Sequence, residues 1–272
     1  IHVSTYADPS RAIGFSEAHA THTPGRFLEH AAAVRRRVGV PVIAVGRIDP
    51  ELAEATIAAG RADFVAMGRK LIADPELPNK LAAGAREDVR PCMYHYRCIS
   101  QIFVSSSIAC AVNAFVGREA ELGSPTPTPA STAAPKKTLL VVGGGPAGLE
   151  AARLAATRGH RVTLVEAGDA LGGRLRAAAA TSGPNAELLE WLERQVRKLP
   201  VEIRLGTAVG VDDIAGAGFD AGFDAVFVAT GARWARPALP GIDGPQVIDV
   251  DGLAPWLAGA LGPPEESLVV IG

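Results

Sequence analysis

The sequence predicts an α/β chain in which the last strand–helix units of a (β/α)8 barrel precede a Rossmann-like domain. The first part is predicted by two successive segments that each place Gly-Arg directly after an apolar strand, with a helix following. The second part is predicted by a glycine fingerprint between an apolar strand and an alanine-rich helix. All three cysteines of the chain lie in the stretch between these two parts.

The bulk composition fits a globular chain and excludes several function classes. The 272 residues are 48% hydrophobic and 21% charged, which is enough apolar material for more than one core. The net charge of −2 gives no reason to expect nucleic acid or an anionic membrane as a partner. We find no signal peptide and no apolar run long enough to span a bilayer, so we expect a cytoplasmic protein with a small-molecule substrate.

Residues 1–84 alternate strands and helices. Apolar residues at helical spacing predict a helix over 27–38, and a continuous apolar run predicts a buried parallel strand over 40–45. The next helix has strong start signals, with Asp49 as N-cap and Pro50 at the first helical position. The pattern then recurs, because a second apolar strand is followed by Asp-Pro-Glu-Leu again.

Each of these two strands ends in a glycine and an arginine, which are Gly46 and Arg47, then Gly68 and Arg69. In a (β/α)8 barrel the loops after the last two strands commonly bind phosphate. A glycine lets main-chain N–H groups approach the phosphate, and an arginine neutralises it. The alternative is that the glycines only make tight turns and the arginines lie on the surface.

The cysteines follow the pattern C-x2-H-x2-C-x11-C, formed by Cys92, His95, Cys98 and Cys110. Such a cluster outside a secreted protein favours metal ligands over a disulfide framework. His95 occupies a position where a fourth thiolate would complete an iron–sulfur ligand set. A Cys3His set is also ordinary for structural zinc, which would make this stretch a zinc staple between two domains.

A proline-rich linker is predicted over residues 119–136, and the dinucleotide-binding part follows it. A strand over 138–142 leads into Gly143–Gly148, which has the pattern G-x-G-x-x-G, and then into a helix over 149–156. The next strand ends at Glu166. Its separation in sequence from the glycine loop is about that of an acid that binds a ribose hydroxyl. Strand, glycine loop, helix and acid together predict a dinucleotide site.

Three later features indicate which dinucleotide binds. They are Leu171-Gly172-Gly173-Arg174, a strand over 224–228 that leads into Ala229-Thr230-Gly231, and Leu239-Pro240-Gly241-Ile242-Asp243-Gly244. These residues resemble the FAD half of the two-dinucleotide-binding-domain flavoproteins. The resemblance implies FAD contacts from Gly143, Gly145, Pro146, Ala147, Gly148, Glu166, Gly173, Arg174, Val209, Ala229 and Gly231.

The order of barrel, cysteine stretch and FAD fold resembles one branch of the old yellow enzyme superfamily, which includes 2,4-dienoyl-CoA reductase and trimethylamine dehydrogenase. Val45–Ile48 and Met67–Arg69 match its FMN-phosphate strands, and Arg90–Cys92 and Cys110–Asn113 match the run into and out of its [4Fe–4S] segment. The family has a cysteine at the position of His95. The barrel strands that carry the substrate acid lie outside the sequence, so no proton donor can be named.

The resemblance implies that NAD(P)H delivers a hydride to FAD, and that the cluster passes electrons to FMN. FMN would then reduce the C=C bond of an unsaturated carbonyl or acyl-CoA; amine oxidation is the alternative within the same family. The implied domains are the barrel end (1–84), the iron–sulfur segment (85–118), the linker (119–136), the FAD-binding domain (137–233) and the start of an NAD(P)H-binding domain (234–272).

Both ends of the sequence lie inside expected elements. The chain begins at Ile1 within an apparent strand, and its last residues, 268–272, repeat the strand and glycine of 140–143. We therefore expect this chain to be a piece of a larger protein.

Overall fold

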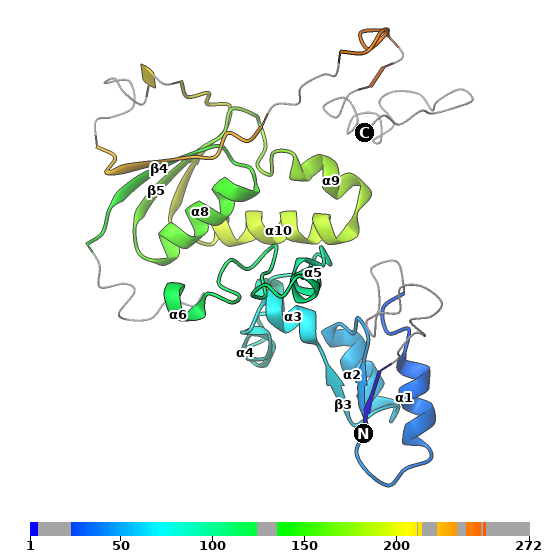
Figure 1. The fold of residues 1–272 in the computed structure, drawn as a ribbon. Coiled ribbons are helices and arrows are strands. Elements are labelled where there is room, and N and C mark those ends of the chain that lie inside the picture. Colours follow the sequence, from blue (N-terminus) through cyan, green and yellow to red (C-terminus); the bar gives the residue numbers. More distant parts are fainter. Residues whose placement is uncertain are drawn as a thin grey trace. The chain divides into compact units, whose positions relative to one another are not determined.

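The computed structural model describes residues 1–4, 23–123, 135–210, 212–213, 222–232, 238–245 and 247–248. The chain divides into two compact units (Figure 1). The barrel unit comprises Ile1–Ala83 and Tyr94–Asn113, and the nucleotide unit comprises Gly84–Met93 and the chain from Ala114 onward. Most of the predicted linker and the predicted strand at 268–271 lie outside the described residues.

The barrel unit holds three short parallel strands in the order β1-β2-β3. The strands are β1 (His2–Val3), β2 (Ile43–Val45) and β3 (Phe64–Ala66), and the helices are α1 (Leu28–Arg35), α2 (Pro50–Ala58), α3 (Gly68–Ala73), α4 (Leu77–Ala82) and α5 (Arg97–Phe103). The start predicted for α2 is confirmed, since the Asp49 side chain accepts a hydrogen bond from the Leu52 N–H at 2.8 Å. The second Asp-Pro-Glu-Leu behaves differently, because α4 begins only at Leu77 and has no side-chain cap.

The core of the barrel unit lies between β2 and the helices beside it. Val42 and Ala44 are fully buried, and they belong to one hydrophobic cluster with Leu28, Ile48 and Ala53. The third strand is only partly covered, because Phe64 is 57% exposed. Within the described residues, this unit therefore has the packing of a partial barrel sheet.

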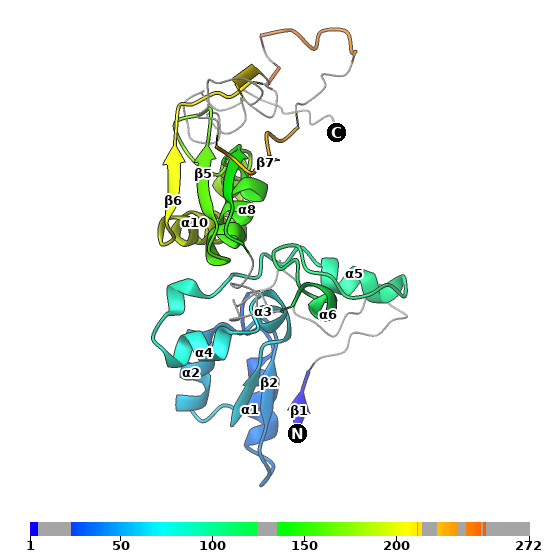
Figure 2. The same cartoon turned by 90° about the vertical axis from the view of Figure 1, so that its left-hand side faces the viewer.

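The nucleotide unit holds a four-stranded parallel sheet in the order β6-β5-β4-β7. Figure 2 shows β6 and β5 of this sheet side by side. Its strands are β4 (Thr138–Val142), β5 (Arg161–Val165), β6 (Val201–Arg204) and β7 (Ala225–Val228). Its helices are α6 (Glu119–Leu122), α8 (Pro146–Thr157), α9 (Leu175–Thr181) and α10 (Gly183–Arg197), with a 3-10 turn η2 (Arg86–Asp88). The first strand in sequence thus lies inside the sheet with the later ones on both sides, as in a doubly wound fold.

The sequence located the strand, glycine loop and helix at the start of this unit but missed several of its other elements. β4 has the predicted bounds, and α8 begins at Pro146 because proline is favoured at the first helical position. No element was predicted between 175 and 204, where the structure has α9, α10 and β6. A signal was present, since the buried face of α10 has helical spacing, with Leu188, Trp191, Leu192 and Val196.

Candidate nucleotide-binding and redox sites

The carboxyl ends of β4, β5 and β7 meet at one edge of the parallel sheet. Two main-chain hydrogen bonds join the loops that leave these strands. The Gly143 N–H donates to the Val165 carbonyl at 2.8 Å, and the Ala229 N–H donates to the Val142 carbonyl at 2.7 Å. This edge, at the switch of strand order, is where ligands bind in doubly wound folds.

The three fingerprint glycines have different roles in this loop. Gly143 has φ +108°, and a Cβ there would lie 2.3 Å from the Ala229 carbonyl oxygen. A Cβ on Gly148 would lie 1.8 Å from the Gly143 carbonyl oxygen, so the helix packs closely against the loop. A Cβ on Gly145 would meet nothing within 4 Å. Gly143 and Gly148 therefore shape the loop, and Gly145 leaves space for a ligand.

Glu166 fixes the loop from the side. One carboxylate oxygen, Oε2, accepts from the Gly144 N–H at 2.6 Å, and Oε1 accepts from the Gly168 N–H at 2.8 Å. A carboxylate has about four acceptor positions. Glu166 can therefore hold the loop and still accept hydrogen bonds from a ribose.

The segment after Glu166 closes over the same loop. The Gly172 N–H donates to the Gly144 carbonyl at 2.7 Å, and a Cβ on Gly173 would lie 3.2 Å from the Gly145 Cα. We call the Gly143–Gly148 loop, with Glu166 and Gly172–Gly173 beside it, the glycine cradle. Its form fits the pyrophosphate of a dinucleotide, because the first N–H groups of α8 have no partner within the helix.

The other residues of the predicted set lie around this edge. Pro146, Ala147 and Arg174 are exposed, and Gly231 has φ +76° in the turn that follows β7. Val209 packs against the buried cluster of Leu140, Val142 and Val165. Direct contact of each of these residues with a cofactor stays a prediction.

In the barrel unit, the two arginines predicted to bind phosphate are brought together by tyrosines. The Arg47 guanidinium carbon lies 4.4 Å from the centre of the Tyr94 ring, and that of Arg69 lies 5.0 Å from the same ring. Arg69 also lies 5.1 Å from the centre of the Tyr96 ring. Both arginines are half-buried, and phosphate binding by them stays a prediction. Sequence reasoning missed the two tyrosines, although both flank His95.

The backbone at this cluster adopts left-handed conformations that residues other than glycine rarely adopt. Arg47, Tyr94 and Tyr96 have φ of 49°, 53° and 65°. Gly46 is fixed by packing as well as by φ, because a Cβ there would lie 2.8 Å from the Phe27 ring. Left-handed non-glycine residues cluster at ligand sites. Two cations gathered on aromatic rings form an arrangement that suits a phosphate dianion.

The four predicted metal ligands all lie within the described residues. Cys92, Cys98 and Cys110 form no disulfide; Cys98 is buried, Cys92 and Cys110 are half-buried, and His95 is exposed. Among the described residues, no three His, Cys, Asp or Glu side chains come together as a metal site. The ligand set therefore stays a prediction.

The environment of Cys98 nevertheless connects it to the other predicted site. Burial raises the pKa of the Cys98 thiol, the nearby Cys110 raises it further, and Arg69 acts in the opposite direction. The end of the stretch is anchored as well, since the amide of buried Asn113 donates to the Ile72 carbonyl at 3.0 Å. Arg69, one of the two arginines of the barrel unit, is thus within electrostatic reach of the Cys98 thiol.

A doubly wound sheet with a glycine cradle, preceded by barrel-type βα units, defines a nucleotide-binding oxidoreductase of more than one domain. Residues 137–272 match the family described as pyridine nucleotide-disulphide oxidoreductase. Residues 12–88 match the NADH:flavin oxidoreductase / NADH oxidase family. The chain belongs to the NADH:flavin oxidoreductases of the old yellow enzyme superfamily, in the branch that joins the end of an FMN barrel to a flavin- and nicotinamide-type nucleotide domain.

Several relatives are similar over most of this chain. A metal reductase of Desulforamulus reducens is 44% identical over 83% of this chain and 33% of its own length. A cinnamate reductase of Clostridium sporogenes is 37% identical over 80% of this chain and 32% of its own length. An N,N-dimethylglycine/sarcosine dehydrogenase of Chromohalobacter salexigens is 38% identical over 78% and 30%. The chain thus spans about a third of the length of the curated relatives it matches.

Solved structures agree with this assignment. A 2-naphthoyl-CoA reductase complex is 34% identical with a TM-score of 0.76, over 89% of this chain and 36% of that protein. The histamine dehydrogenase of Rhizobium sp. 4-9 is 31% identical with a TM-score of 0.70, over 78% and 31%. Within the described residues, no helix has the length and apolar character needed to cross a membrane.

Proposed function

We propose that the full protein is a flavin- and [4Fe–4S]-dependent oxidoreductase that uses NAD(P)H to reduce the C=C bond of an unsaturated carbonyl or acyl-CoA compound. The observation that carries this proposal is the glycine cradle, in which packing leaves only Gly145, of the three fingerprint glycines, open to a ligand. The relatives named cinnamate reductase and 2-naphthoyl-CoA reductase support this substrate class.

Each cofactor has a group of residues that fits its chemistry. The cradle and the first turn of α8 would hold the FAD pyrophosphate, with Glu166 on the ribose. Arg47 and Arg69 would hold the FMN phosphate by charge-assisted hydrogen bonds. When bound, these flavins and the cluster would supply the hydride and single-electron chemistry of the reaction.

The cysteine stretch would ligate the cluster through Cys92, His95, Cys98 and Cys110. Three cysteines outside any disulfide and one imidazole match iron–sulfur and zinc ligation equally well in donor type. The family membership favours iron, because the branch carries a cluster at this place in the chain. We place this chemistry in the cytoplasm, where thiols stay reduced.

The test is a cofactor and substrate assay of the full-length protein purified without air. We expect FMN, FAD and about four irons per chain, and bleaching of the flavins by NADH or NADPH. Cinnamate and an unsaturated acyl-CoA should then reoxidise the reduced protein with loss of the C=C bond. If the protein contains zinc and no iron, the cysteine stretch is a zinc staple and the proposed cluster is wrong. If only a metal ion reoxidises the reduced protein, the proposed substrate class is wrong.

Amine oxidation is the second candidate, favoured by the N,N-dimethylglycine/sarcosine dehydrogenase and histamine dehydrogenase among the similar proteins. In this case, a secondary or tertiary amine should bleach the flavin in the absence of NAD(P)H. Alkene reduction predicts no bleaching by amines, so one anaerobic titration with each reductant separates the two candidates.

A further inference from the structure

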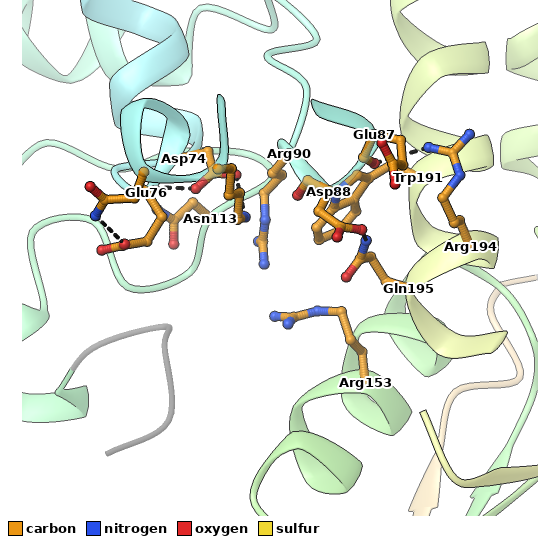
Figure 3. Close-up of polar contacts among 12 residues, drawn as sticks. Asp74, Glu76, Glu87, Asp88, Arg90, Asn113, Arg153, Trp191, Arg194 and Gln195 are labelled. Carbon is orange, nitrogen blue, oxygen red and sulfur yellow. Dashed lines mark hydrogen bonds and ion pairs between the residues drawn. The ribbon is translucent and has the colours of Figure 1, made fainter. Parts of the chain in front are cut away.

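The residues that lead into Cys92 are bound to the helices of the nucleotide unit. The Trp191 indole N–H donates to the Asp88 carbonyl at 3.0 Å, and the Gln195 amide donates to the Asp88 carboxylate at 2.7 Å (Figure 3). Two cations at the C-terminal end of α10 add contacts: Lys198, just after the helix, lies 2.6 Å from the Asp88 carboxylate, and Arg194 donates to the Glu87 carbonyl at 2.9 Å. The η2 turn is therefore attached to one side of α10.

Arg90 continues this attachment in a buried position. Its side chain is inserted beside Trp191, with the guanidinium carbon 4.6 Å from the ring centre, and Nη2 lies 3.1 Å from Glu150 Oε1. Arg90 is 5% exposed and Trp191 4%. A buried arginine with both a carboxylate and an aromatic face is a well-determined contact.

A second arginine contacts the same two partners. Arg153 binds the Glu150 carboxylate through two nitrogens, at 2.8 and 2.9 Å, and lies 5.5 Å from the Trp191 ring centre. Without Arg90, Glu150 would keep its pairing with Arg153, and Trp191 would keep its place in the helix packing. The contacts of Arg90 are therefore not required for the packing of α8 on α10. They act on the peptide that carries Arg90.

The two partners of the Arg90–Glu150 ion pair lie close in sequence to the two predicted sites. Arg90 is close to Cys92, and Glu150 is close to the glycine cradle. Cys92 follows Arg90 by two residues. Glu150 lies five residues after Gly145 on α8, about 7.5 Å along a helix axis. The first turns of α8, the Glu150–Arg90 ion pair and two residues of chain thus connect the cradle to Cys92 within one unit.

We propose that Arg90 is a positioning residue that holds Cys92 at a fixed place relative to the glycine cradle. The proposal rests on the proposed function in one respect, that Cys92 ligates the cluster. The positioning itself does not require a bound metal, since the ion pair with Glu150 and the contact with Trp191 would determine where the 86–92 peptide lies.

The test is hydrogen exchange of the full-length protein with Arg90→Ala, Arg90→Lys and the matched control Arg86→Ala, in which an exposed arginine of the same peptide is removed. The amides of Asp88 and Val89 report on the peptide, because they donate to the carbonyls of Ala85 and Arg86. In Arg90→Ala they should exchange at least about tenfold faster, as expected for loss of a charge-assisted contact. The lysine variant should recover part of this protection, since it keeps the charge but not the planar fork.

A second readout separates positioning from plain stability. The EPR spectrum and midpoint potential of the cluster should change in Arg90→Ala and stay unchanged in Arg86→Ala. Unchanged exchange at Asp88 and Val89 would overturn the proposal, and so would a uniform increase across α8 and α10. Faster exchange of the peptide with an unchanged spectrum would reduce Arg90 to a structural residue.

The failure of the proposed function has its own signature. If the wild-type protein contains no iron, the cluster is absent and the proposed function fails. The exchange comparison still decides whether Arg90 fixes the Cys92 peptide. If Arg90→Ala does not fold, the lysine variant provides the same comparison against Arg86→Ala.

Discussion

The glycine cradle of the nucleotide unit is shaped by main-chain contacts, whereas the arginine pair of the barrel unit is held by aromatic side chains. In the cradle, hydrogen bonds from Gly143 and Ala229 join the strands, and Glu166 fixes the loop. In the barrel unit, Arg47 and Arg69 gather on Tyr94, which comes from another part of the chain. Both sites draw on separated parts of the chain, since Ala229 lies 86 positions after Gly143 and Tyr94 lies 47 positions after Arg47. The two sites therefore differ in the kind of contact that holds them.

The strands of the two units also differ in length. β4 and β5 each have five residues and pair along their whole length, whereas β2 and β3 have three. A dinucleotide loop needs only one strand–helix–strand unit. A barrel site needs the closed ring of strands, of which the described barrel unit contains three. The two sites should therefore respond differently to substitution.

The largest effect is expected at Gly148, where shape is fixed by main-chain packing. Gly148→Ala would place a Cβ 1.8 Å from the Gly143 carbonyl oxygen, a contact that the rigid loop cannot relieve. We expect a loss of about 3 kcal/mol or more in unfolding free energy, the upper end of overpacking costs. Denaturant unfolding followed by Trp fluorescence measures it. Wild-type stability would show that the loop is less rigid than the structure indicates.

Gly145→Val tests the ligand side of the same loop. A Cβ here meets no protein atom within 4 Å, so the fold should remain, but the side chain would occupy the place expected for the pyrophosphate. The FAD content should fall below about a tenth of wild type, because lost charge-assisted hydrogen bonds cost ~1.5–3 kcal/mol each. Flavin extraction with a stability measurement on the same sample is the assay. A full complement of FAD would disprove the cradle assignment.

Arg69→Gln moves the comparison to the barrel unit. Removal of this charge should weaken FMN binding by roughly 10- to 100-fold and leave FAD unchanged, since one charge-assisted contact is lost. Arg36→Gln is the matched control, because Arg36 is exposed at the end of α1. Loss of FAD with retention of FMN would contradict the assignment of the two sites.

The smallest effect concerns His95, which is exposed in the described structure. If its imidazole ligates the fourth iron, the cluster carries one negative charge less than with a thiolate, and its potential is higher. His95→Cys should then keep the cluster and lower its potential, and His95→Ala should leave a labile or three-iron site. Redox titration with EPR compares all three forms. Identical spectra and potentials in wild type and His95→Ala would leave three cysteine ligands only.

Some failures of prediction have a clear physical origin. The helix α10 and the strand β6 were missed, although Trp191 and Val196 lie on a buried face with helical spacing. The partners of that face could not be predicted, since Trp191 meets Asp88 from 103 positions earlier in the chain. Hydrophobic spacing indicates that a face is buried, and it does not indicate what covers it.

The sequence by itself determined the features that depend on local geometry. The cap at Asp49, the strand β4, the glycine loop and the acid at Glu166 each follow from residues within a few turns of chain. Only the tertiary structure decided that Glu166 holds the loop it faces, that Tyr94 gathers two arginines, and that Arg90 pairs with Glu150 beside Trp191. Local motifs restrict φ and ψ directly, whereas contacts between distant side chains exist only after the elements have packed.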